Sequence, residues 1–120
     1  MRILIADDEP SIVVALEFLL RQAGYEVSVA RDGDEAVAKL ERERPELVLL
    51  DVMMPQRSGY EVCRHLRARP ELAGTKVIML SARGGARELE RGMEAGADLY
   101  VMKPFSNREL LERIRGLLSR

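Results

Sequence analysis

The chain has 120 residues, 47% of them hydrophobic, which is enough to bury one core and too short for two domains. Its formal net charge of −1 provides no overall positive field that would attract nucleic acid or an anionic membrane. The one cysteine, Cys63, cannot form an internal disulfide, and we find no signal-peptide pattern and no apolar run of membrane-spanning length. We therefore expect one cytoplasmic domain over residues 1–120, with no direct nucleic-acid or membrane binding.

The first third of the chain alternates strand and helix patterns. Residues 2–6 form an apolar run typical of a short strand, and the sequence Asp-Asp-Glu-Pro follows it at once. Apolar residues then recur at helical spacing over 10–23, and the glycine that follows fits a helix end. Residues 25–30 alternate like a strand at the edge of a sheet, and 32–44 predict a second helix with an acidic capping pair at its start.

The middle of the chain contains its most informative stretch, residues 46–59. Residues 47–50 are four consecutive apolar residues, which is typical of a strand buried on both faces of a parallel sheet. Asp51 stands where this run ends, and a loop closed by Gly59 leads to a predicted helix over 60–69. An aspartate at a strand end more often caps the next helix than carries chemistry, so a functional Asp51 requires support from elsewhere in the chain.

The last third of the chain predicts two more strands and two more helices. Residues 76–80 form an apolar strand that ends at Ser81. The helix pattern over 84–96 begins with two glycines and has a thin apolar stripe, so we expect it to be the least stable helix. Residues 99–102 predict the fifth strand, and a capping box opens the last helix over 106–118.

Five predicted strands alternate with five predicted helices. Such an alternation calls for a parallel sheet with helices on both faces and right-handed crossover connections. We therefore predict an α/β fold with a five-stranded parallel sheet of (βα)5 type, in the flavodoxin-like strand order 2-1-3-4-5. In this order the second strand lies at the edge of the sheet.

Polar residues follow four of the five predicted strands. They are Asp7 and Asp8, Asp51, Ser81 and Lys103. The carboxyl ends of parallel strands meet at one edge of a sheet, so these side chains share a crevice. Three carboxylates placed together repel one another and raise at least one pKa, which makes a hard divalent cation such as Mg²⁺ a suitable partner. Acids, a cation, a lysine and a hydroxyl together suit phosphoryl transfer.

Four sequence motifs connect these residues to a known family. In chain order they are D-D-E-P, L-L-D-V-M-M-P-Q-R-S-G, M-L-S-A and G-A-D-L-Y-V-M-K-P-F. Each motif alone is weak, but the four together, in this order and spacing, closely resemble the receiver domain of two-component response regulators. The resemblance covers essentially the whole chain.

The resemblance implies a role for each acid. Asp51 would be the phosphoacceptor, which takes a phosphoryl group from the phosphohistidine of a histidine kinase or phosphotransfer protein. Asp8 and Asp51 would bind Mg²⁺ directly together with the backbone carbonyl of Met53, and Asp7 would act largely through water. The chain would thus accept its own phosphoryl group rather than act as an enzyme on other substrates.

The resemblance also implies roles for three residues near the later strands. Lys103 would pair with the phosphoryl oxygens, Ser81 would donate a hydrogen bond to one of them, and Tyr100 would be the switch aromatic that turns inward when Ser81 moves. The bond from Lys103 to Pro104 resembles the family's cis peptide. Taken singly, these residues suit a helix cap, an ordinary strand residue and a solvated charge; their joint placement favours function.

The resemblance places the output surface on the fourth predicted helix, the fifth strand and the last helix. Phosphorylation would change this face and so control an output domain or a downstream protein, and the face also allows a homodimer. Leu99 stands where many relatives carry a second acid that joins a charged dimer interface. Arg91, Asp98 and Arg113 remain, so such a dimer is possible, but the missing acid gives it less support.

Two further positions resemble those that tune self-dephosphorylation, namely Met53 and Arg83. Neither side chain orients an attacking water well, which predicts slow loss of the phosphoryl group. One alternative, a flavodoxin-like cofactor binder, requires a Ser/Thr/Gly-rich loop that donates hydrogen bonds to phosphate, at the place where the acids lie. Another, an aspartyl-phosphate hydrolase, needs an acid in place of Met53. A pseudo-receiver would not need the intact acid set.

Overall fold

The computed structural model describes residues 1–82 and 84–119. In this part of the chain, five parallel strands are hydrogen-bonded in the order β2-β1-β3-β4-β5, which confirms the predicted topology. The strands are β1 (Arg2–Ala6), β2 (Glu26–Ala30), β3 (Leu47–Asp51), β4 (Lys76–Ser81) and β5 (Leu99–Met102). The helices are α1 (Pro10–Gln22), α2 (Gly33–Glu43), α3 (Gly59–Arg67), α4 (Ala86–Ala95) and α5 (Asn107–Leu118), with a short 3₁₀ turn η1 (Pro70–Leu72) before β4.

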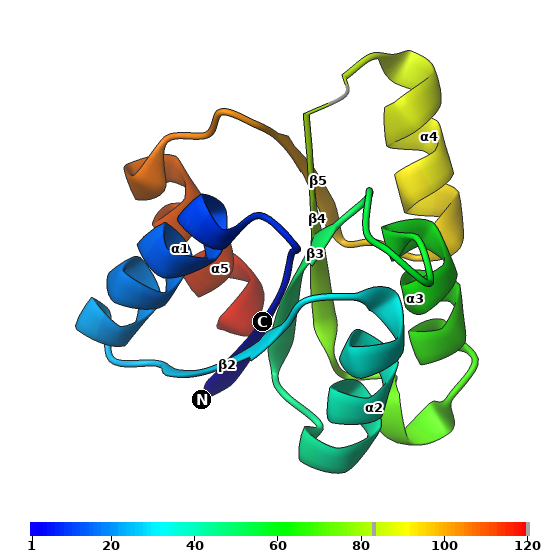
Figure 1. Cartoon of the computed structure of the whole chain (residues 1–120), viewed down its shortest axis with the longest axis horizontal. Helices are drawn as coiled ribbons and strands as arrows, with labels where there is room; N and C mark the ends of the chain where they lie inside the picture. Colours follow the sequence, from blue (N-terminus) through cyan, green and yellow to red (C-terminus); the bar gives the residue numbers. More distant parts are fainter. Residues whose placement is uncertain (83, 120) are drawn as a thin grey trace.

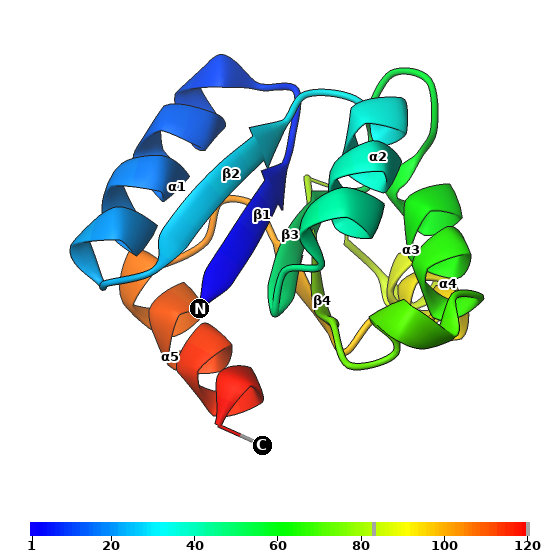
Figure 2. The ribbon, with the colours of Figure 1, turned by 90° about the horizontal axis from the view of Figure 1, so that it is seen from below.

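Two helical layers enclose the sheet. Helices α1 and α5 cover one face, and α2, α3 and α4 cover the other (Figures 1 and 2). Alternate residues of the inner strands point to opposite layers, so that Leu49 packs in the α1–α5 cluster and Leu50 in the α2–α4 cluster. Leu47–Leu50 are all 0% exposed, which explains why this strand is uniformly apolar in sequence. None of the described helices is long and apolar enough to cross a membrane.

The helix starts differ in how well they are capped. The side chain of Asp32 accepts from the backbone N–H of the residue three positions on at the start of α2, and Ser58 and Ser106 do the same for α3 and α5. Helix α4 instead follows Gly85, which has a φ of 114° and makes no side-chain cap. Helix α3 is shorter than predicted: it ends at Arg67 rather than near residue 69.

Candidate functional site

The acids that follow β1 and β3 meet at the carboxyl edge of the sheet. Asp7, Asp8 and Asp51 each offer a carboxylate oxygen within 4.8 Å of the others. Asp51 is the last residue of β3 and pairs in register with Leu80 of β4, so Ser81 extends one residue further along the same edge. The structure therefore brings the three predicted acids together and places the predicted hydroxyl at the next strand end.

Lys103 binds this acid cluster directly. Its Nζ lies 2.9 Å from Oδ2 of Asp7 and 3.6 Å from Oδ1 of Asp51, and its side chain is only 9% exposed. Glu9 adds a third carboxylate at 3.4 Å, although the sequence analysis gave it no role. Its position two residues after Asp7 is the feature of the sequence that could have predicted this contact. Lys103 precedes Pro104 through a cis peptide bond, as expected.

The electrostatics of the cluster are unbalanced. Burial, reinforced by the charge of Asp7, raises the pKa of Asp51 to about 7, although Lys103 opposes the shift. Burial lowers the pKa of Lys103, but the hydrogen bond to Asp7 and the charge of Asp51 outweigh it, so the lysine pKa is raised overall. One lysine thus does not neutralise the carboxylates around it.

The donor set fits Mg²⁺. All the candidate ligands are hard oxygen donors, and the excess negative charge suits a small divalent cation. Asp8 is exposed and Asp51 lies at the floor of the crevice at 5% exposure. Asp7 is 0% exposed, and its oxygens already accept from Lys103 and from the backbone N–H of Glu9 at 2.9 Å. This arrangement leaves Asp8 and Asp51 as the carboxylates best placed to bind a cation directly.

The loop between β3 and α3 forms the other side of the crevice. The backbone N–H of Met53 donates to Oδ1 of Asp51 at 3.3 Å, and the Met53 side chain faces solvent at 56% exposure. At Gly59 a Cβ would lie 2.4 Å from the backbone oxygen of Asp51. Glycine is therefore required where α3 begins, because it lets the helix start directly against the strand end that carries Asp51.

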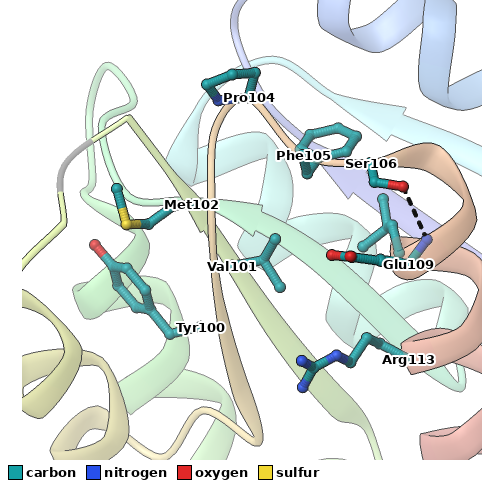
Figure 3. A pocket seen from close by; sticks show the side chains of 9 residues that line it. Tyr100, Val101, Met102, Pro104, Phe105, Ser106, Glu109 and Arg113 are labelled. Atoms are coloured by element: carbon teal, nitrogen blue, oxygen red, sulfur yellow. Dashed lines mark hydrogen bonds between the residues drawn. The ribbon is translucent and has the colours of Figure 1, made fainter.

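Ser81 and Tyr100 lie on the two strands that follow β3 in the sheet order. Ser81 is 1% exposed at the end of β4, and Tyr100 is half-buried on β5, packed against the core cluster under α4. Figure 3 shows Tyr100 and Val101 on opposite sides of the strand. A Cβ at Gly92 of α4 would lie 2.9 Å from the Tyr100 ring, so this glycine makes room for the aromatic side chain. Arg83, the second predicted tuning position, lies outside the described residues.

Two of the three charged residues considered for a dimer have partners within the chain. Asp98 accepts from Arg67 at 2.9 Å, and Arg91 lies over the ring of Tyr60 at 4.3 Å from its centroid. Arg113 lines a pocket of ≈ 290 Å³ between β5 and α5 (Figure 3). Because Asp98 and Arg91 already have partners within the chain, the structure gives a charged dimer interface little support. The pocket beside Arg113 instead leaves part of this face open.

Comparisons with known proteins agree with this geometry. The family model of the response regulator receiver domain matches residues 3–115. The phosphate regulon transcriptional regulatory protein PhoB of Rhizobium meliloti (strain 1021) is 44% identical over 119 residues, which are 99% of this chain and 52% of that protein. The chain spans about half the length of the curated relatives it matches.

Solved structures of the same fold are also similar in sequence. A CheY-like response regulator receiver domain protein from Methanospirillum hungatei JF-1 has a TM-score of 0.92 and 36% identity, with 98% of this chain and 93% of that chain covered. The receiver domain of a sensor histidine kinase from Pseudomonas aeruginosa PAO1 has a TM-score of 0.92 and 31% identity, with 99% and 98% covered, and holds a magnesium ion in its active site cleft. The chain therefore belongs to the response regulator receiver domains of two-component signalling.

Proposed function

We propose that residues 1–120 form one cytoplasmic receiver domain that accepts a phosphoryl group on Asp51 from the phosphohistidine of a histidine kinase or phosphotransfer protein. The observation that carries this proposal is the cluster of Asp7, Asp8 and Asp51 oxygens within 4.8 Å of one another, with the Lys103 ammonium bound at its edge. Such a crevice combines a buried carboxylate nucleophile with a lysine ammonium and with carboxylates that suit a divalent cation, which are the groups that phosphoryl transfer requires.

In the proposed step, a carboxylate oxygen of Asp51 forms a bond to phosphorus while the phosphorus–nitrogen bond of the donor breaks. The departing imidazole nitrogen keeps the electron pair. Lys103 is close enough to Asp51, at 3.6 Å, to pair with the phosphoryl oxygens, and Ser81 donates its hydroxyl hydrogen to one of them. Mg²⁺, held by Asp8, Asp51 and the Met53 carbonyl with Asp7 acting largely through water, would neutralise charge on the transferred group.

We also propose that the α4-β5-α5 face carries the signal onward. Capture of the phosphoryl group by Ser81 and Lys103 would shift the balance between two arrangements of this face, with Tyr100 turning inward. The support is that Leu89, Met93 and Met102 are about half exposed there, at 46%, 45% and 51%. Exposed apolar side chains beside a pocket suit the docking of an output domain or a downstream protein, and a homodimer is a second use of the same face.

The acceptor assignment is tested by phosphorylation with acetyl phosphate and Mg²⁺. Intact-mass spectrometry should show one added phosphoryl group on the wild-type chain and none on Asp51→Asn. A parallel incubation with a chelator should leave the wild type unmodified, because the reaction depends on the cation. Circular dichroism confirms that the variant is folded. Equal labelling of the two proteins would overturn the assignment of Asp51.

A further inference from the structure

The turn between β2 and α2 contributes no side chain to the acid cluster, yet its backbone contacts both sides of it. On one side, the backbone N–H of Asp7 donates to the carbonyl of Ala30, the last residue of β2, at 3.0 Å. On the other side, the backbone N–H of Gly33 donates to the carbonyl of Pro55 in the β3–α3 loop, also at 3.0 Å. In Figure 2 the start of α2 lies beside this loop. The turn therefore bridges the two segments that form the crevice.

The contact between Gly33 and the loop leaves no room for a side chain. A Cβ at Gly33 would lie 2.4 Å from both the Cβ and the backbone oxygen of Arg57. Gly33 does not have a positive φ, so its lack of a side chain serves close approach rather than an unusual backbone conformation. The α2 start is itself fixed, because Asp32 accepts from the N–H of Glu35 at 2.8 Å.

The loop that rests on Gly33 is a tight turn. The N–H of Arg57 donates to the carbonyl of Pro55 at 2.9 Å around Gln56, which has a φ of 73°. The base of the loop is closed by a second bond, from the N–H of Gly59 to the carbonyl of Val52 at 2.8 Å. The loop is closed at its base and turned tightly at its tip. We therefore expect a displacement of the backbone at Arg57 to move the backbone at residue 53 as well.

An ion pair adds a side-chain tie to the same contact. Nε of Arg57 lies 2.9 Å from Oδ1 of Asp34, with side chains 40% and 58% exposed. An exposed pair of this kind stabilises the loop only slightly. The backbone bond from Gly33 and the close approach of Arg57 therefore account for most of the attachment.

We propose that Gly33 is a positioning residue for the metal site, which sets the Met53 carbonyl at its distance from Asp51 through the Pro55–Arg57 turn. The inference rests on the proposed function, because it assumes that this loop supplies a Mg²⁺ ligand. It assigns the β2–α2 turn a role in cation binding that its residue types do not reveal. Residues that orient metal ligands from outside the coordination shell commonly change metal affinity when they are altered.

The test is Gly33→Ala, with Gly116→Ala in α5 as the matched control, since a Cβ at Gly116 would meet no atom within 4 Å beyond its own stretch of helix backbone. Isothermal titration calorimetry should show the Mg²⁺ Kd of Gly33→Ala raised by about tenfold and that of Gly116→Ala unchanged. Raising the Mg²⁺ concentration should restore the phosphorylation rate of Gly33→Ala. In the metal-free protein, hydrogen exchange at the Arg57 amide should be faster, a readout that does not depend on the cation.

Two more variants separate the failure of this inference from the failure of the proposed function. Asp8→Asn should lose Mg²⁺ binding, and if it binds as the wild type does, the metal site itself is wrongly assigned. Asp34→Ala removes only the exposed ion pair and should raise the Kd about twofold at an unchanged Tm. A wild-type Kd in a folded Gly33→Ala, with Asp8→Asn impaired, would overturn the role of Gly33 alone. If Gly33→Ala does not fold, Arg57→Gly loosens the same contact from the loop side, and a Kd no higher than that of Asp34→Ala would then overturn the proposal.

Discussion

A long basic side chain contacts several partners at the amino edge of the sheet, where the strands begin, and another does so at the carboxyl edge, where they end. The two edges differ in how well the positive charge is balanced by carboxylates. At the amino edge, Arg67 donates to the carbonyls of Gly96 and Thr75, each at 2.8 Å, and to Asp98 at 2.9 Å. Asp98 also accepts from the backbone N–H of Val77 at 2.8 Å. One cation meets one anion here, and these bonds join the end of α3 to β4 and to the segment before β5.

At the carboxyl edge the same kind of contact is left unbalanced. Lys103 faces Asp7, Glu9 and Asp51 within 3.6 Å, and Asp8 lies in the same cluster. Burial and the neighbouring charge of Asp7 disfavour a negative charge on Asp51, and they raise its pKa to about 7. We infer that the matched edge serves stability, whereas the unmatched edge has an excess of negative charge that a bound cation would neutralise.

The largest expected effect breaks the matched edge. Arg67→Ala leaves Asp98 without its cation and the carbonyls of Gly96 and Thr75 without their donor, so the free energy of unfolding should fall by roughly 3 kcal/mol. Urea denaturation measures the loss. Phosphorylation of the folded variant by acetyl phosphate should proceed at the wild-type rate, because the opposite edge is untouched.

Arg69→Ala is the matched control for Arg67→Ala. Arg69 pairs with Glu41 and Glu71 on the surface, where its side chain is 43% exposed, so its removal should change stability little. A variant of Arg67 that kept its stability, or lost phosphorylation while still folded, would break the division of roles between the two edges.

The next effect sharpens the comparison through pH. The pKa of Asp51 is about 7 in the folded chain and 3.8 as an ordinary value, so between these pH values the folded state binds more protons than the unfolded state. Stability from this group is therefore lost as pH rises from about 4 to 7. In chelator, Asp51→Asn should gain over the wild type, and its advantage should grow by roughly 2 kcal/mol between about pH 5 and pH 8.

Urea denaturation of both proteins across this pH range measures that growth. Added Mg²⁺ should stabilise the wild type more than Asp51→Asn, since the asparagine carries no charge for the cation to neutralise. If the free energy of unfolding of Asp51→Asn exceeded that of the wild type by the same amount at every pH, the charge of Asp51 would not destabilise the folded chain.

Much of this architecture could be predicted from the sequence, because burial fixes which residue types each strand needs. The continuous apolar run before Asp51 matches a strand that is fully buried, and the parallel alternation places the acids, Ser81 and Lys103 at one edge. Helix α3 ends two residues earlier than predicted because Arg69, which precedes Pro70, is extended, with a φ of −104° and a ψ of 112°.

What the sequence could not provide depends on distances rather than residue types. The role of Gly33 comes from a backbone N–H and an absent Cβ, neither of which any motif encodes. Glu9 reaches Lys103 only because the chain turns immediately after β1, and Asp98 is already paired with Arg67, which lies 31 positions away. Contacts between distant segments of this kind follow from tertiary packing, which the pattern of residue types along a single sequence does not specify.

The smallest expected effect concerns how long the unbalanced edge holds a phosphoryl group. Hydrolysis requires a water in line with the phosphorus, and Met53, two residues after Asp51, is exposed to solvent in the loop beside Asp8. A thioether accepts hydrogen bonds poorly, and an arginine at position 83 only donates, so neither side chain takes up a proton from the water. We expect slow self-dephosphorylation, which suits a transcriptional output.

Met53→Asn combined with Arg83→Glu should speed the decay about tenfold, which corresponds to about 1.4 kcal/mol in the barrier. A decay series in Mg²⁺ measures both rates; wild-type loss within seconds, or a double variant that decays no faster, would contradict this assignment.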